Sequence, residues 1–90
     1  MRIEWDPKKA RSNLRKHKVS FEEAATAVSD PLSITGVDPD HSMNEERYVT
    51  FGTSVRGRLL VVAHTEEHET IRIISARLAS KREQKLYEEG

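Results

Sequence analysis

The segment IRIISAR, Ile71 to Arg77, decides how the fold of this chain is interpreted. Its apolar residues recur with the two-residue period of a β-strand, which predicts a strand in the core of a small domain. Two arginines stand in this strand, at positions 72 and 77. Because side chains alternate across a strand, Arg72 is expected on the face opposite to Ile71 and Ile73. Arg77 shares the parity of the isoleucines, but at the strand end it is free to turn outward.

Segments with the same period precede this strand and predict a sheet. The candidate strands cover residues 32–35, 47–53, 58–66 and 70–77, and residues 2–5 are a short further candidate. Short turns at 55–57 and 67–69 join the last three strands, so an antiparallel meander is the expected topology.

Capping signals predict the helices. Asp6 followed by Pro7 is typical of a helix start, and that helix is expected to run to about residue 17. The S-x-x-E spacing of a capping box occurs at 20–23 and again at 80–83. These two boxes predict a second helix that ends before the proline at position 31 and a short third helix through about residue 88.

Together these elements predict one α+β domain over residues 1–90, with two N-terminal helices packed on one face of a small antiparallel sheet and a short C-terminal helix. Parity along the strands predicts which apolar residues lie beneath the helices: Val49, Phe51, Leu59, Val61, Ala63, Ile71 and Ile73. The same parity predicts an open face that carries Arg58, His64, Glu66 and Arg72.

Composition excludes several classes of protein. The 90 residues are 36% hydrophobic and 33% charged, which fits one small soluble domain rather than two. No cysteine is present, so disulfides and thiolate metal sites are excluded and a cytoplasmic location is expected. No signal peptide and no membrane span are expected either, because no apolar run approaches the roughly 18 residues that a span needs.

Charge is separated along the chain although the formal net charge is zero. Residues 2–18 and 72–85 are basic, whereas the polar loop at 38–46 is acidic. The two basic blocks fit either an anionic partner or an ordinary solvated surface of mixed charge. The acidic loop is interpreted as a solvated connection.

The predicted open face suits a phosphodiester. Arginine forks bind phosphate oxygens, and a histidine transfers protons near neutral pH. Arg58, His64, Glu66 and Arg72 would thus supply what RNA cleavage requires without a metal ion or another cofactor. The alternative is that these residues form exposed cross-strand ion pairs, such as Glu66 with Arg72.

Other candidates carry weaker signals. The segment HTEEH, from His64 to His68, matches the H-x-x-E-H pattern of a class of zinc peptidases. That chemistry needs a helix, whereas this segment is a predicted strand and turn, so no metal site is predicted. His17 is interpreted as a helix cap or packing residue. Tyr87 is either a base-stacking residue or part of the core.

The whole chain resembles the BrnT family of ribonuclease toxins from bacterial type II toxin–antitoxin systems. The matching residues are Glu4-Trp5-Asp6, Lys16-His17, the segment 19–24, Asp30-Pro31, Glu46-Arg47, the segments 58–62 and 71–77, Glu83 and Tyr87. The resemblance implies a RelE-like fold and a metal-independent endoribonuclease that cleaves mRNA and arrests translation and growth. It also implies a BrnA-like antitoxin with a ribbon-helix-helix part, so that operator DNA is bound only through the toxin–antitoxin complex.

By resemblance, the family's basic site corresponds to Arg58, Arg72 and Arg77, with His64 as the proton-transfer group. The residues expected to contact RNA are Lys8, Lys9, Lys81, Arg82 and Tyr87. The chain also departs from the family pattern: Glu67 and Leu78 replace basic residues, and Lys18 stands where a glycine often ends the first helix. An alternative function is therefore a weakened or inactive homologue that binds the antitoxin and acts as a co-repressor, and another is RNA binding without cleavage.

Overall fold

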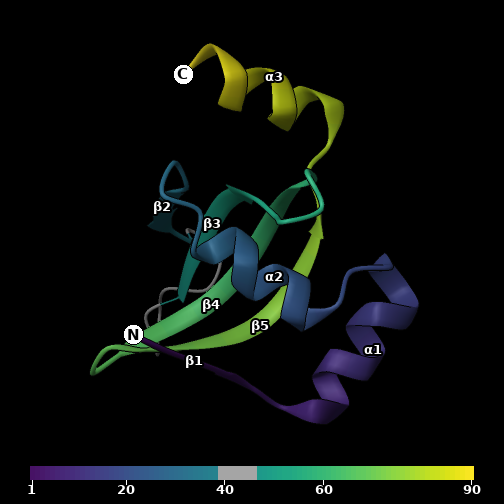
Figure 1. The fold of residues 1–90 in the computed structure, drawn as a ribbon, viewed down its shortest axis with the longest axis vertical. Helices are drawn as coiled ribbons and strands as arrows, with labels where there is room; N and C mark the ends of the chain where they lie inside the picture. The colour runs from purple at the N-terminus through teal and green to yellow at the C-terminus, as the bar shows by residue number, and fades with distance from the viewer. Residues whose placement is uncertain (39–46) are drawn as a thin grey trace.

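The computed structural model describes residues 1–38 and 47–90, which fold into helices packed on a five-stranded sheet (Figure 1). Except for Asp38, the predicted acidic loop lies outside the described residues. The elements are β1 (Arg2–Trp5), α1 (Pro7–His17), α2 (Phe21–Val28), β2 (Ile34–Val37), β3 (Arg47–Thr53), β4 (Leu59–Glu67), β5 (Thr70–Leu78) and α3 (Lys81–Glu89).

The sheet has the strand order β1-β5-β4-β3-β2. Strands β2 to β5 form the predicted antiparallel meander. β1 pairs with β5 in parallel, so the sheet is mixed rather than wholly antiparallel. The predicted α+β architecture is otherwise the one observed, with α1 and α2 against one face and α3 at one end of the sheet (Figure 1).

The predicted N-caps form, and of the two predicted capping boxes the one at 80–83 is complete, whereas the Glu23 carboxylate of the other binds Arg58 and Ser54. The Asp6 carboxylate accepts a hydrogen bond from the Lys8 amide at 2.9 Å, and the Ser20 hydroxyl accepts one from the Glu23 amide at 3.0 Å. At the start of α3, Ser80 forms a complete capping box with the glutamate three residues on. These contacts satisfy amides that have no partner within a helix, so the local sequence fixes where each helix begins.

The core lies between the sheet and the helices α1 and α2. It contains Val19, Phe21, Ala24, Ala27, Leu60, Val62, Ile73 and Ala76. Ile71 and Ile73 are buried as predicted, but the even-numbered residues of β4 face the helices instead of the odd-numbered ones. The prediction that Val49, Phe51, Leu59, Val61 and Ala63 lie beneath the helices is therefore wrong. It failed because β4 is apolar on both faces, so parity alone did not distinguish them.

A β-bulge in β5 changes the parity of that strand. Ala63 pairs with Ser75, whereas His64 pairs with Ile73, so Ile74 is the extra residue without a partner on β4. Two residues on opposite sides of the bulge therefore lie on the same face of the sheet when their residue numbers differ by an odd number. This is why Ile73 and Ala76 both enter the core.

Helix α1 ends at Lys18, which adopts the left-handed conformation with φ 61° and ψ 30°. The expectation of a glycine-like position is confirmed. The strain of a side chain in this conformation predicts that Lys18→Gly stabilises the protein by about 1 kcal/mol. Urea unfolding tests this, with Lys16→Gly inside the same helix as the control, which should cost about 1 kcal/mol. A Lys18→Gly variant less stable than wild type would contradict the expectation.

Candidate functional site

We call the sheet face turned away from α1 and α2 the outer face. It is defined by pairing across the strands and contains Val49, Phe51, Val61, Ala63, Thr65, Arg72, Ser75 and Arg77. Paired residues in antiparallel strands project to the same side, and Arg72 pairs with Thr65 while Arg77 pairs with Val61. The bulge at Ile74 therefore places both arginines on the outer face, with guanidinium-bearing side chains 49% and 45% exposed.

Arg72 is held by a carboxylate from the neighbouring strand. Its Nη1 donates to Glu4 Oε2 at 2.8 Å, and Glu4 is the residue that pairs with it across β1 and β5. The ion pair between Glu66 and Arg72 considered from the sequence does not form, because Glu66 pairs with Ile71 and shares the opposite face. Arg72 thus keeps an exposed guanidinium whose orientation is fixed.

Arg77 forms a two-pronged ion pair with α3. Its Nη1 and Nη2 donate to the two carboxylate oxygens of Glu83 at 2.8 and 2.9 Å. This fork is the main reason why the pKa of Glu83 falls to about 2, with a further contribution from the Ser80 amide. Glu83, the acidic residue of the α3 capping box, therefore also binds Arg77 on the outer face.

Asn13 positions the end of β5. Its Nδ2 donates to the carbonyls of Val19 and Ala76 at 2.9 and 2.8 Å, and its Oδ1 accepts from the Ala76 amide at 3.0 Å. These bonds tie α1 to the residue directly before Arg77. Sequence reasoning missed Asn13, although a polar residue on the inner side of an amphipathic helix was a signal for such a clamp.

Arg58 does not lie on the outer face, so its predicted placement is wrong. Its Nε and Nη2 donate to Glu23 at 2.9 and 2.5 Å, and its Nη2 also reaches the Lys18 carbonyl at 3.3 Å. Glu23 is buried and accepts from the Ser54 hydroxyl at 2.7 Å, and the Arg58 fork holds the pKa of Glu23 below its usual value. Arg58 precedes β4, and the carboxylate of α2 draws it toward the helices, so it ties the β3–β4 turn to α2.

His64 is fully buried on the helix-facing side, and its predicted place on the open face is also wrong. Its Nδ1 lies 3.4 Å from the Thr65 carbonyl, which assigns the proton to Nδ1 and makes Nε2 an acceptor. The Thr50 hydroxyl donates to Nε2 at 2.7 Å and lies 2.7 Å from the Thr35 hydroxyl, while Tyr48 stacks on the ring with 6.0 Å between centroids. His64 is an even-numbered residue of β4, like the buried Leu60 and Val62, and therefore projects to the same side of the sheet.

Burial lowers the pKa of His64 below the ordinary 6.5, which predicts an acid-sensitive fold. As the pH falls, the unfolded chain binds the proton at this position first. Stability is therefore complete above about pH 6.5 and declines from there toward the folded pKa, by at most about 1.4 kcal/mol per pH unit. Urea midpoints at pH 7.5 and 5.5 should shift less in His64→Gln than in wild type. Equal shifts would contradict the assignment.

The predicted RNA-contacting residues divide between two helices. Lys8 and Lys9 are exposed in the first turn of α1, which packs on the other side of the sheet from the outer face. Lys81 and Arg82 are exposed in the first turn of α3, and Tyr87 is half-buried near its end. Of these residues, only those of α3 lie on the same helix as Glu83, which binds Arg77.

Neither metal coordination nor membrane insertion gains support within residues 1–38 and 47–90. His64 and His68 of the HTEEH segment lie in a strand and a turn rather than on a helix. Among the described residues, no group of three or more metal-ligating side chains occurs. In the same part of the chain, every helix is too short or too polar to cross a membrane.

Comparison with known proteins identifies the class of molecule. A family model for ribonuclease toxins of type II toxin–antitoxin systems matches residues 5–83. The chain therefore belongs to the BrnT family of these toxins, as its resemblance indicated. The crystal structure of the Brucella abortus ribonuclease toxin BrnT is similar, with 25% identity, a TM-score of 0.65, and coverage of 90% of this chain and 99% of that one. Curated protein sequences gave no match.

Proposed function

We propose that this toxin is a metal-independent endoribonuclease that acts in the cytoplasm, cleaves mRNA and arrests translation and growth. Membership of a ribonuclease toxin family supports the reaction class. One observation carries the proposed site: Arg72 and Arg77 lie exposed on the same outer face. An RNA strand bound across this face would have both guanidinium groups available for its phosphates.

Arg72 would bind the scissile phosphate and Arg77 a neighbouring one, each by exchanging its carboxylate partner. Each fork now bonds a carboxylate at 2.8 Å, and a phosphate presents similar oxygens to the same donors. In the cleavage step the ribose 2′-oxygen attacks phosphorus and negative charge builds on the phosphate oxygens. Cations fixed in place before that step stabilise the charge without reorganisation.

A carboxylate beside the arginines would transfer the proton. Glu4 lies 2.8 Å from Arg72 on the outer face, whereas His64 is enclosed in the core. Glu4 would accept the proton of the 2′-hydroxyl and return it to the leaving 5′-oxygen, so proton balance is kept. Arg58 and His64 would then support the fold, as their buried contacts indicate.

The test is cleavage of end-labelled RNA in EDTA by the wild type and by the Glu4→Gln and His64→Gln variants. Cleavage that Glu4→Gln loses and a folded His64→Gln retains would support the proposal. The opposite result would restore the proton-transfer role predicted for His64. Intact RNA in every lane, with normal growth on expression, would favour the inactive co-repressor homologue.

The partner we propose is a BrnA-like antitoxin with a ribbon-helix-helix part, through which the complex binds operator DNA. Type II toxin–antitoxin membership supports a protein antitoxin. Expression of the toxin alone should slow growth, and co-expression of the antitoxin should restore it. Gel-shift assays should show operator binding by the complex and none by the toxin alone.

A further inference from the structure

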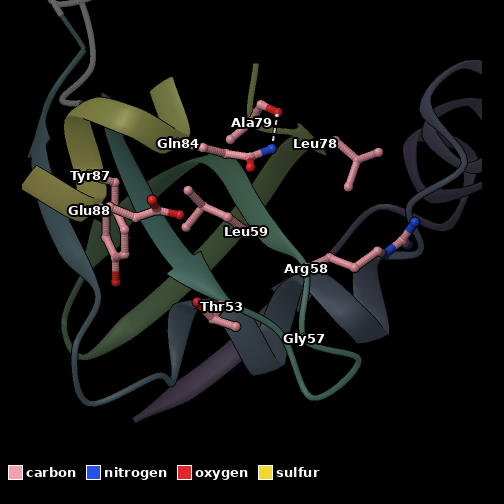
Figure 2. Close-up of a pocket in the computed structure, with 9 residues that line it drawn as sticks. All are labelled: Thr53, Gly57, Arg58, Leu59, Leu78, Ala79, Gln84, Tyr87 and Glu88. Carbon is pink, nitrogen blue, oxygen red and sulfur yellow. Dashed lines mark hydrogen bonds between the residues drawn. The ribbon is translucent and has the colours of Figure 1, made fainter. Parts of the chain in front are cut away.

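A hollow of about 440 Å³ lies between α3 and the β3–β4 hairpin (Figure 2). Leu59 and Leu78 are its large aliphatic lining residues, and Tyr87 closes one side. The volume falls within the range of about 300 to 1,000 Å³ that is usual for small-ligand sites. The hollow is therefore large enough for a nucleobase.

Tyr87 is held as a fixed aromatic wall. Its hydroxyl donates to the Leu32 carbonyl at 3.0 Å, which anchors the ring by its tip. The same residue borders a second, apolar hollow of about 210 Å³ beside Ile34 and Phe51. Open space thus adjoins an aromatic ring whose position is already set, which is the arrangement that favours base stacking.

The polar groups that face the larger hollow include two acceptors. Gln84 Nε2 donates to the Ala79 carbonyl at 3.3 Å, so its Oε1 is left directed toward the hollow (Figure 2). The Glu88 carboxylate also points inward, toward Leu59. A ligand edge rich in hydrogen-bond donors would match these groups.

We propose that this hollow is a subsite for a guanine base of the RNA substrate. Guanine presents two adjacent donors, N1–H and N2–H, on its pairing edge, and a carboxylate accepts both in a fork. Adenine, cytosine and uracil each present a single donor group on that edge. Glu88 would bind the two donors, Gln84 Oε1 would accept the remaining amino proton, and the base would stack on Tyr87.

This subsite rests on the proposed function and extends it to sequence preference. Arg77 binds Glu83 of α3, and Gln84, the next residue of that helix, lines the hollow. Helix α3 thus connects the hollow to a phosphate-binding arginine. The toxin would then cut at sites defined by a neighbouring guanosine.

The experiment titrates GMP, AMP, CMP and UMP into the labelled protein and follows amide shifts by NMR. Because each of the four nucleotides carries the same phosphate group, differences in their binding report on the base. GMP should bind most tightly and shift Leu59, Leu78 and Gln84. Glu88→Gln should weaken GMP at least about 10-fold and leave AMP unchanged, while the matched Glu89→Gln should change neither.

Cleavage-site mapping on a mixed-sequence RNA separates this inference from the proposed function. Guanine binding that depends on Glu88, in a protein that leaves RNA intact, would support the subsite and count against the nuclease. Cleavage without guanosine preference, together with equal shifts for all four nucleotides, would overturn the subsite and leave the nuclease standing. Equal effects of Glu88→Gln and Glu89→Gln would also overturn it.

Discussion

Arg72→Gln and Arg77→Gln should each lower the rate of RNA cleavage by about 100-fold or more, the usual effect of removing one preorganised donor from a developing charge. Both side chains project from the outer face, and each guanidinium is fixed by a carboxylate at 2.8 Å. The loss should appear in the rate of the chemical step under single-turnover conditions. Growth arrest on expression should be relieved in parallel.

The fold should survive both substitutions. Exposed ion pairs contribute about 1 kcal/mol or less, so the melting temperature should change little. Arg15→Gln is the matched control, because it makes the same change of charge on an exposed position of α1, against the other face of the sheet. Full activity of both outer-face variants, or equal loss in the Arg15 control, would contradict the site.

Gly52→Ala should destabilise the protein by about 3 kcal/mol, the upper part of the range for overpacked sites. A Cβ at this position would lie 2.1 Å from the backbone oxygen of Ala27 and 2.9 Å from its carbonyl carbon. Helix α2 thus packs directly on the backbone of β3. Since the obstacle is backbone, the helix itself would have to move, and chemical denaturation should show the loss.

Gly36→Ala is the matched control for this effect. Gly36 lies in the adjacent strand β2, and nothing would come within 4 Å of a Cβ added there. Its substitution should leave stability within about 0.5 kcal/mol of wild type. Similar losses in the two variants would show that glycine content, rather than the contact between α2 and β3, determines stability.

The arginine–carboxylate pairs have a consequence for activity. In the described structure Arg58, Arg72 and Arg77 each bond a glutamate, which fits the formal net charge of zero. In the proposed function, RNA would therefore compete with Glu4 and Glu83 for the outer-face arginines. Binding should weaken with added salt less steeply than it would on an unpaired basic surface of the same size.

The sequence by itself determined the elements and their order. Asp6, Ser20 and Ser80 mark the helix starts because a capping side chain needs only the amides that follow it. The meander of β2 to β5 was likewise predictable, since turn signals act over a few residues. The left-handed end of α1 at Lys18 was expected from the family resemblance. The family resemblance, which the whole chain carries, was confirmed by the match over residues 5–83.

Only the tertiary structure decided which residues share a face. The bulge at Ile74 places Arg72 and Arg77 on one face of the sheet. His64 is buried on the helix-facing side of β4, and Glu23 of α2 binds Arg58. Parity assigns faces correctly only while the register is unbroken and one face is clearly apolar. β4 is apolar on both faces and β5 carries an extra residue, so the site depended on pairing and packing between segments far apart in the sequence.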